Sequence, residues 1–244
     1  MKLNILAIGA HPDDIELSCS GTLAVHKNLG YKIGILDLTQ GELGSRGSVE
    51  IRQNESSNAS KILDLDIREN LSFSDGFFKN DEAHQLELIK VIRKYQPDII
   101  LANAPNDRHP DHGRGALLIK DACFLSGLVK IETTFNGELQ KPWRPKKIFN
   151  YIQDLYLEPD FVIDISAVFD KKIASIKAYE SQFYSESING PKTYISSEEY
   201  LNLVEYRNRL MGKKIGVKYG EGFLSIHNHI GLTSFSNIIL PEFV

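Results

Sequence analysis

The stretch LNILAIGAHPDDIELSCSGTLAVHKNLGYKIGILDLT, residues 3–39, decides the expected fold. Its apolar run at residues 3–8 is typical of a buried strand, and the run at residues 32–39 is typical of a second one. Between them, a helical pattern over about residues 15–29 ends at Gly30, a residue type that commonly follows a helix. A strand followed by a helix and another strand is the repeating unit of a parallel sheet.

The same alternation of strands and helices continues outward from this stretch. The pattern predicts a polar amphipathic helix at 49–64 and a weak strand at 68–73. It then predicts a helix at 80–95 that is capped by Asn80 and stops before Pro97. The clearest strand of the chain follows at 98–103, and another helix at 114–128. We therefore expect an α/β fold with an open, mostly parallel sheet and helices on both of its faces.

The second half of the chain has a less regular pattern. We expect strands at 147–153 and 161–165, a helix from a cap at Ser166 to about Tyr184, a helix at 197–211 after a capping box of Ser196 and Glu199, and an extended tail from residue 215. No internal repeat, linker or shift in composition divides the chain. The sequence therefore predicts a single domain over residues 1–244 with a C-terminal elaboration.

The composition argues against several classes of protein. Among 244 residues, 28 are Lys or Arg and 32 are Asp or Glu, and the net charge of −4 does not favour a nucleic-acid binder or a polybasic membrane protein. No stretch approaches the ~20 apolar residues that a transmembrane helix needs, and the N-terminal segment lacks the features of a signal peptide. The two cysteines, Cys19 and Cys123, have no metal-binding or redox spacing. We expect a cytoplasmic protein with reduced thiols, no membrane contact and no nucleic-acid partner.

The residues that carry chemistry lie in two short clusters. His11-Pro12-Asp13-Asp14 follows the first expected strand, and His109-Pro110-Asp111-His112 follows the strand at 98–103. We expect each cluster to form a loop at the carboxyl end of its strand, which is where ligands bind in open α/β sheets if the strand order reverses there. If these two strands are neighbours, the two loops face each other across one crevice.

Imidazole and carboxylate groups without a thiolate suit zinc, and also iron, manganese, cobalt or nickel. A catalytic zinc typically takes three protein ligands, so a larger cluster leaves groups that can act as general base and general acid. The sequence alone does not say which of Asp13 and Asp14 is the base and which is a ligand. The alternative interpretation, a pair of polar turns, is disfavoured because the motif occurs twice, each time after a strand. The first turn also lacks the G-x-G-x-x-G pattern of a dinucleotide site.

The segment AHPDDIELSCSGTLA (10–24), together with HPDH (109–112), resembles the LmbE-like (PIG-L) zinc-dependent N-deacetylases of N-acetylglucosamine conjugates. The resemblance covers about residues 3–224, and it implies a Rossmann-like fold. Further segments look like the branch of this family that serves bacillithiol biosynthesis, which removes acetate from N-acetylglucosaminyl-malate. These segments are GELGSRGSVEIR (41–52), LSFSDGFF (71–78), NDRHPDHGRG (106–115), YESQF (179–183) and KTYISSEEYL with IGVKYGEGF (192–223).

The resemblance implies a role for each residue of the two clusters. His11, Asp14 and His112 would ligate the metal, and Asp13 would be the general base. His109 would stabilise the oxyanion or act as general acid, with Asp111 orienting it. The metal would be Zn²⁺, with Fe²⁺ or another divalent transition metal as the alternative. Family members are often trimers or hexamers, so we also expect a homo-oligomer.

The expected substrate also explains several residues outside the clusters. Malate carries two carboxylates, which arginine side chains bind with two parallel hydrogen bonds. Arg46, Arg52 and Arg108 lie in segments expected at the same sheet edge, and Arg52 also matches the active-site arginine of the family. Asp75 is a candidate for binding sugar hydroxyls, although the pattern favours the other interpretation, a turn-forming Asp before Gly76.

We therefore predict a metal-dependent hydrolase that converts N-acetylglucosaminyl-malate to glucosaminyl-malate and acetate. One alternative is a deacetylase of another N-acetylglucosamine conjugate or of a chitooligosaccharide. A second is a non-catalytic module that binds a sugar or a metal. A further metal site at His227 and His229 is conceivable, but exposed histidines in the tail are the simpler interpretation.

Overall fold

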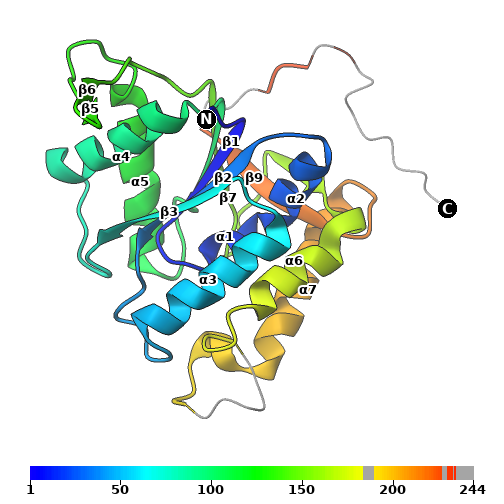
Figure 1. Ribbon diagram of the computed structural model, residues 1–244. Coiled ribbons are helices and arrows are strands. Elements are labelled where there is room, and N and C mark those ends of the chain that lie inside the picture. Colours follow the sequence, from blue (N-terminus) through cyan, green and yellow to red (C-terminus); the bar gives the residue numbers. More distant parts are fainter. Residues whose placement is uncertain (184–189, 227–229, 233, 235–244) are drawn as a thin grey trace.

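The computed structural model describes residues 1–183, 190–226, 230–232 and 234. Within these residues, the centre of the molecule is a seven-stranded sheet in the order β3-β2-β1-β4-β7-β9-β8 (Figure 1). Its strands are β1 (Ile5–Gly9), β2 (Ile33–Thr39), β3 (Ile67–Phe73), β4 (Ile99–Ala102), β7 (Lys147–Tyr151), β8 (Phe161–Asp164) and β9 (Gly220–Ser225). The prediction of an α/β fold around such a sheet is confirmed.

Strand β1 lies between two parallel neighbours, with Ile5 opposite Ile33 of β2 and opposite Ile99 of β4. β2 also pairs in parallel with β3, and β4 with β7, whereas β9 runs antiparallel to both β7 and β8. The sheet is therefore mostly parallel, as predicted. Because the strand order reverses at β1, the carboxyl ends of β1 and β4 meet at the position where such folds bind ligands.

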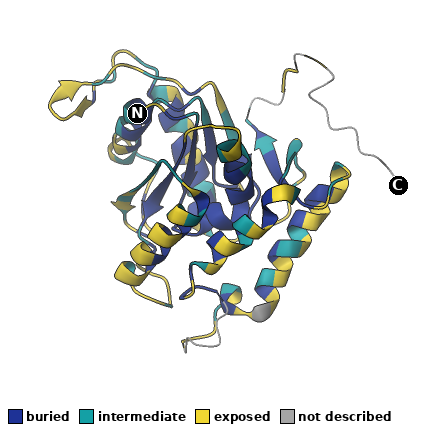
Figure 2. Cartoon of the chain, turned by 45° about the vertical axis from the view of Figure 1, so that its right-hand side comes forward, coloured by how far each residue is buried: buried dark blue, intermediate teal, exposed yellow. Residues whose placement is uncertain are grey.

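Helices cover both faces of the sheet (Figure 1). They are α1 (Asp14–Ser18), α2 (Ser20–Asn28), α3 (Val49–Leu63), α4 (Glu82–Tyr95), α5 (Pro110–Leu125), α6 (Phe169–Lys177) and α7 (Glu198–Lys214), with short 3₁₀ helices η1 (Ser166–Val168) and η2 (Tyr194–Ser196). Successive side chains of β1 point to opposite faces. Leu6 and Ile8 join the core under α4 and α5, whereas Ile5 and Ala7 join the core under α1 and α2. All residues of β1 and β2 are buried, which explains their continuous apolar sequences (Figure 2).

Several predicted boundaries in the first half of the chain are wrong. The helix expected over 15–29 is two helices, because the backbone leaves the helical conformation at Cys19, with φ −137°. The cap of α4 is Asp81 rather than Asn80, since the Asp81 side chain accepts from the backbone N–H of His84. The helix expected from residue 114 begins at Pro110, so the second motif is the start of a helix and not a loop.

Three features of the second half also differ from the prediction. The helix that follows Ser166 ends at Lys177 rather than near residue 184. The capping box is formed by Thr193 and Ser196 around η2, not by Ser196 with Glu199. A small hairpin of β5 (Thr134–Phe135) and β6 (Glu138–Leu139) was not predicted.

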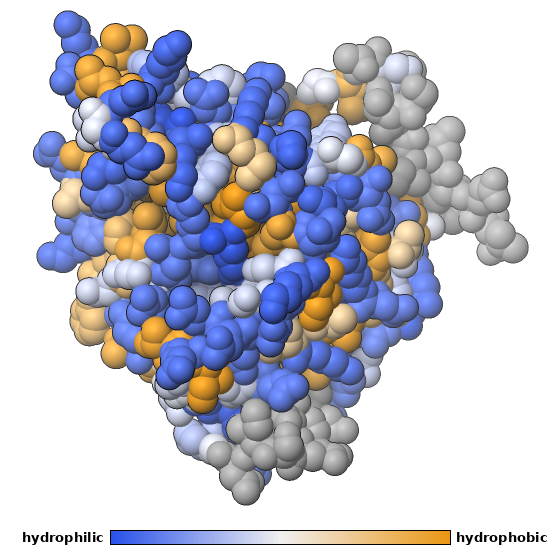
Figure 3. Space-filling model, viewed as in Figure 1, coloured by the Kyte–Doolittle hydropathy of each residue, from blue (hydrophilic) through white to orange (hydrophobic). Residues whose placement is uncertain are grey.

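The surface in Figure 3 is mostly hydrophilic, with hydrophobic residues in separate groups. In the described parts of the chain, no helix combines the length and the apolar character that crossing a membrane requires. The two tail histidines, His227 and His229, lie outside the described residues.

Candidate active site

The two histidine–aspartate motifs meet at the carboxyl ends of β1 and β4, because these strands are neighbours. Both motifs line one open cleft of about 320 Å³. The expectation that they share a crevice is confirmed. Segments from across the chain complete its walls, and the candidates Arg46, Arg52, Asp75 and Arg108 all contribute to them.

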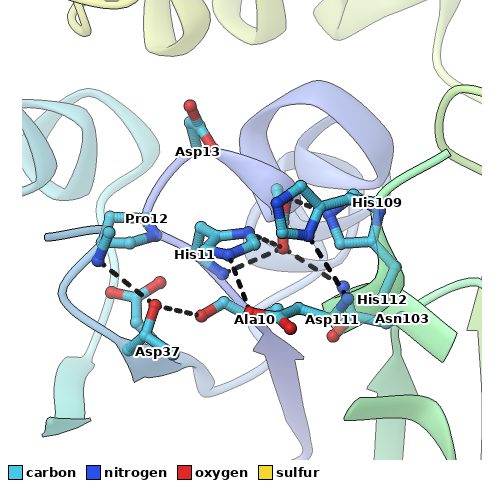
Figure 4. A network of polar contacts seen from close by, with 12 residues as sticks. Ala10, His11, Pro12, Asp13, Asp37, Asn103, His109, Asp111 and His112 are labelled. Atoms are coloured by element: carbon cyan, nitrogen blue, oxygen red, sulfur yellow. Dashed lines mark hydrogen bonds and ion pairs between the residues drawn. The ribbon is translucent and has the colours of Figure 1, made fainter. Parts of the chain in front are cut away.

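The first motif is a sharp turn between β1 and α1. Asp13 has a φ of 122°, which is rare for a residue with a Cβ atom, and such a conformation costs about 1–3 kcal/mol. In Figure 4 the carboxyl group of Asp13 points away from the imidazole rings, which gather on the other side of the turn. Strained backbone is common in active sites, where the surrounding structure holds it in place.

The second motif begins α5. His109 is the N-cap residue, and its Nδ1 atom accepts from the backbone N–H of Asp111 at 3.3 Å. Pro110 occupies the first helical turn, where its missing N–H has no partner to lose. The helix places His109 and His112 on the same side, with ring centroids 5.3 Å apart. The ring of His11 lies 4.6 Å from that of His109 and 5.7 Å from that of His112.

The carboxylate of Asp14 stands between the two predicted histidine ligands. Its oxygens lie 3.6 Å from His11 Nδ1 and 3.2 Å from His112 Nε2. The same carboxylate accepts hydrogen bonds from Asn103 Nδ2 at 3.2 Å and from Gln153 Nε2 at 2.6 Å. It also accepts one from the backbone N–H of His11, in the same turn. Burial raises the pKa of Asp14, but the charge of His112 and these histidine contacts outweigh it and hold the pKa well below its usual range.

The outer nitrogen of each histidine faces a carboxylate. His11 Nε2 lies 3.0 Å from Asp75 and 3.4 Å from Asp111, and His112 Nδ1 lies 2.6 Å from Asp107. Burial lowers the pKa of His112, but Asp14 and Asp107 together raise it to about 9. The pKa of His11 is likewise raised by its carboxylate neighbours against the effect of burial.

These residues fit a divalent metal ion. Four carboxylates contact the two imidazole rings, so a proton on each ring still leaves excess negative charge, which Arg114 offsets only in part. The donors are imidazole nitrogens and carboxylate oxygens, the set that zinc and its transition-metal neighbours prefer. Among the residues that the structure describes, two groups bring their ligand atoms within 4.8 Å of one another: His11, His109 and His112, and His11, Asp75 and Asp111. The predicted set of His11, Asp14 and His112 is also contiguous, through the two contacts of Asp14.

Asp13 is paired with a different group. Arg52, from α3, places Nη2 2.5 Å from the Asp13 carboxylate and donates from Nε to the carbonyl of Pro12. Burial raises the pKa of Asp13 to about 6, although the charge of Arg52 lowers it. His109, which also lines the cleft, has a pKa lowered by burial and by the charges of His11 and His112.

Asp75 and Asp111 have partners other than the expected ones. Asp75 accepts from the Leu43 N–H at 3.0 Å and contacts His11, and although burial raises its pKa, the His11 contact lowers it to about 2. The carboxylate of Asp111 accepts from the Gly76 N–H and from Arg114, and its link to His109 runs through the backbone.

The other two arginines also have protein partners. Arg46 donates from Nε to the Ser181 carbonyl at 2.7 Å and from Nη1 to the Pro191 carbonyl at 3.2 Å. Arg108 is half exposed, lies 3.3 Å from the Asp154 carboxylate, and stacks on the Tyr194 ring with its guanidinium carbon 4.6 Å from the centroid. Arg108 is therefore the more accessible of these two cations.

The sequence analysis did not single out Asn103, Asp107 or Gln153, which contact the predicted metal ligands. Asn103 and Asp107 lie close to the second motif, so a search of its flanking polar residues could have found them. Gln153 follows β7, about forty residues further along the chain, and only the pairing of β7 with β4 brings it to the site.

Comparison with known proteins shows what this chain is similar to. The family model described as GlcNAc-PI de-N-acetylase (PIG-L) matches residues 6–123, which contain both motifs. A solved structure, the conserved protein TT1542 from Thermus thermophilus, is 36% identical, with 95% of this chain and 98% of that chain covered and a TM-score of 0.83.

Two curated relatives carry named activities. A diacetylchitobiose deacetylase of Thermococcus kodakarensis is 28% identical, covering 89% of this chain and 81% of its own. A probable N-acetyl-α-D-glucosaminyl L-malate deacetylase 2 of Bacillus subtilis is 27% identical, covering 75% and 84% respectively.

Proposed function

Because the chain belongs to the PIG-L family of de-N-acetylases, we propose that it hydrolyses the acetamide of an N-acetylglucosamine conjugate. One observation carries the proposal: Asp14 lies between His11 and His112, and Asp13 lines the same cleft. This arrangement separates a candidate metal site from a candidate base. A non-catalytic binding module would need the metal site but not the base.

We assign the metal to His11, Asp14 and His112. Zinc is the ion we propose. When bound, such an ion supplies Lewis-acid polarisation of a carbonyl group and of water. The two imidazoles and the carboxylate favour this assignment over the alternative group of His11, Asp75 and Asp111, because Asp75 and Asp111 both face the outer nitrogen of His11. Carboxylates in that position typically orient a histidine ligand.

Asp13 is the proposed proton acceptor. Water attacks the acetamide carbonyl carbon, and Asp13 takes the proton that the water loses. With its pKa raised to about 6, this carboxylate is ionised at pH 7 yet more basic than an ordinary Asp. Arg52 holds the carboxylate in place and keeps it charged.

His109 is the proposed donor to the carbonyl oxygen, where negative charge develops. His109 lines the cleft and is partly buried. Its Nδ1 atom accepts from the Asp111 N–H, which leaves Nε2 as the nitrogen able to donate. The C–N bond then breaks, and the proton taken by Asp13 passes to the amine nitrogen of the leaving glucosamine. Acetate and the free amine are the products.

N-Acetylglucosaminyl-malate is the substrate that we propose. Arg108 supports an acidic aglycone, because it is half exposed in the cleft wall and its partner Asp154 can be exchanged for a substrate carboxylate. Arg46 lines the same cleft. The similarity to a diacetylchitobiose deacetylase favours the second candidate, a chitooligosaccharide.

We also propose that the protein is cytoplasmic and forms a homo-oligomer, a trimer or a hexamer. Light scattering on the purified protein tests the oligomeric state.

Acetate release by metal-loaded protein tests the proposal. The substrates are N-acetylglucosaminyl-malate, free N-acetylglucosamine and diacetylchitobiose, each with and without a chelator. We expect release that the chelator abolishes, with the malate conjugate preferred. Release from free N-acetylglucosamine or diacetylchitobiose alone would support the deacetylase activity and refute N-acetylglucosaminyl-malate as the substrate. No release from any of them refutes the proposed activity and favours a binding module.

Asp13→Asn tests the base, and Asp121→Asn is its matched control, since Asp121 bonds Asn80 and does not line the cleft. We expect Asp13→Asn to lower the rate by about 10²–10⁴-fold without weakening metal binding. A rate near that of the unchanged chain would exclude Asp13 as the base.

A further inference from the structure

Asp107 has a side chain with no exposed surface, and it lies two residues before the second motif. One of its oxygens, Oδ2, is 2.6 Å from Nδ1 of His112. The other nitrogen of this ring, Nε2, faces Asp14 at 3.2 Å. Asp107 therefore sits behind His112, on the side of the ring that is turned away from the candidate metal position.

The second oxygen of Asp107 holds another segment. Oδ1 accepts from the backbone N–H of Leu155 at 2.7 Å and of Asp154 at 3.2 Å, in the loop that follows β7. The same loop supplies Gln153, whose Nε2 donates to Asp14 at 2.6 Å. Asp107 thus connects one predicted ligand, His112, to the loop that orients a second, Asp14.

We infer that Asp107 is a positioning residue that makes Nε2 of His112 the metal-binding nitrogen. An imidazole that donates its Nδ1 proton to a carboxylate keeps its free electron pair on Nε2. That pair then points toward Asp14, where the proposed function places the metal, and the inference rests on this ligand assignment. Carboxylates behind histidine ligands typically raise metal affinity by about 10–100-fold.

Asp107→Asn is an informative substitution because of its hydrogen-bond demands. The two N–H groups of residues 154 and 155 need an acceptor, so they favour the amide oxygen of the new side chain on their side. The amide NH₂ group then faces Nδ1 of His112 and donates to it. The ring must carry its own proton on Nε2, the nitrogen that is meant to bind the metal.

The test is the zinc affinity of the full chain, measured by competition with a chromophoric chelator. We expect the dissociation constant to rise by about 10–100-fold in Asp107→Asn and to stay unchanged in the control Asp121→Asn, which alters a carboxylate on α5 outside the cleft. The absorption spectrum of the cobalt-loaded variant should also change, because it reports the ligands around the ion. If Asp107→Asn does not yield folded protein, Asp107→Ser, which leaves room for a water molecule, takes its place.

A double-mutant cycle with His112→Ala separates positioning from a general loss of structure. If Asp107 acts through His112, the Asp107→Asn change has no further effect on zinc affinity once His112 is absent. An equal loss in both backgrounds, or an unchanged affinity in Asp107→Asn alone, would overturn the inference. If His112→Ala itself binds zinc normally, the ligand assignment of the proposed function is wrong, and the inference about Asp107 is refuted with it.

Discussion

Lys172→Met should lower the unfolding free energy by about 3 kcal/mol, because it breaks a buried ion pair. The Lys172 side chain has no exposed surface and that of Glu221 is 1% exposed, and their charged atoms lie 2.7 Å apart. The ammonium group also donates to the carbonyls of Glu16 and Leu17 in α1. The pair therefore ties α6 and β9 to the short helix that begins at Asp14.

The size of the stability loss depends on the hydrogen bonds that the remaining partner of the pair retains. Removing one partner of a buried pair typically costs about 3–5 kcal/mol. After Lys172→Met, Glu221 still accepts from the N–H groups of Gly21 and Thr22 at the start of α2, at 3.0 and 2.6 Å, so we expect the lower end of that range. After Glu221→Gln, Lys172 is left with two carbonyl oxygens and no counter-charge.

The two variants should differ in their pH dependence. Burial lowers the pKa of Lys172 and Glu221 raises it, so Glu221→Gln lowers it further. A base whose pKa is lower in the folded chain is destabilising while it is charged, and this cost is relieved as the pH rises through the folded pKa. The stability difference between the unchanged chain and Glu221→Gln should therefore narrow as the pH rises toward 10.5, the ordinary pKa of lysine, by about 1.4 kcal/mol for each unit by which the substitution lowers the pKa of Lys172.

Urea unfolding followed by circular dichroism measures these quantities, with the double variant Lys172→Met/Glu221→Gln completing the cycle. We expect the double variant to be more stable than the sum of the single losses predicts, by at least about 2 kcal/mol. Additive losses, within about 0.5 kcal/mol, would show that the pair is not coupled and would refute the reasoning.

Three further predictions concern the cleft and the thiols. In chelator-treated protein, Asp13→Asn should be more stable than the unchanged chain by up to about 3 kcal/mol at pH 7, because the Asp13 pKa is raised from 3.8 to about 6 and charging this carboxylate destabilises the fold. This cost develops between the two pKa values, so the difference in stability should vanish below pH 4. A difference that does not depend on pH in urea titrations would contradict this origin. Arg108→Ala should raise the KM for N-acetylglucosaminyl-malate at least about tenfold and leave the rate on free N-acetylglucosamine unchanged, as expected for one lost charge-assisted contact; equal effects on both substrates would argue against aglycone recognition. Cys19 and Cys123 should not react with a thiol reagent until the chain unfolds, because burial raises the pKa of both, and rapid labelling of native protein would disprove their burial.

The sequence predicted the sheet well where burial acts on both faces of a strand. The runs that became β1 and β2 are mostly apolar, and such short segments between turn residues are typical of buried strands. The break at Cys19 could not be predicted, because neither Gly nor Pro marks it. By contrast, the hairpin of β5 and β6 had a signal that was overlooked: Asn136 and Gly137 both have positive φ values, of 53° and 82°, and Asn-Gly is the preferred pair for such a turn.

The site was predictable to the extent that its residues are close in sequence. Two four-residue motifs at strand ends supplied most of its polar groups, and strand adjacency brought them together. The start of α5 was misplaced because His109 is an uncommon cap and Pro110 resembled a turn residue. The groups behind the ligands, such as Gln153, depend on which distant strand lies beside β4, and a sequence pattern does not contain that information.

The two motifs have similar sequences, but the first forms a sharp turn and the second begins a helix. This difference helps to distinguish the general base from the metal ligand. In the first, Asp13 has a positive φ and its carboxylate points away from the imidazole rings, where it pairs with Arg52, whereas the carboxylate of Asp14 contacts His11 and His112 (Figure 4). Asp14 faces two imidazoles and its pKa falls, whereas Asp13 is buried beside one guanidinium and its pKa rises. In the second, Pro110 starts a helix, and the helical repeat brings His109 and His112 to the same side. A base must be able to take a proton near neutral pH, which a pKa of about 6 allows. The contacts of Asp14 with both proposed histidine ligands and the raised pKa of Asp13 therefore favour Asp14 as the ligand and Asp13 as the base, the distinction that the sequence alone left open.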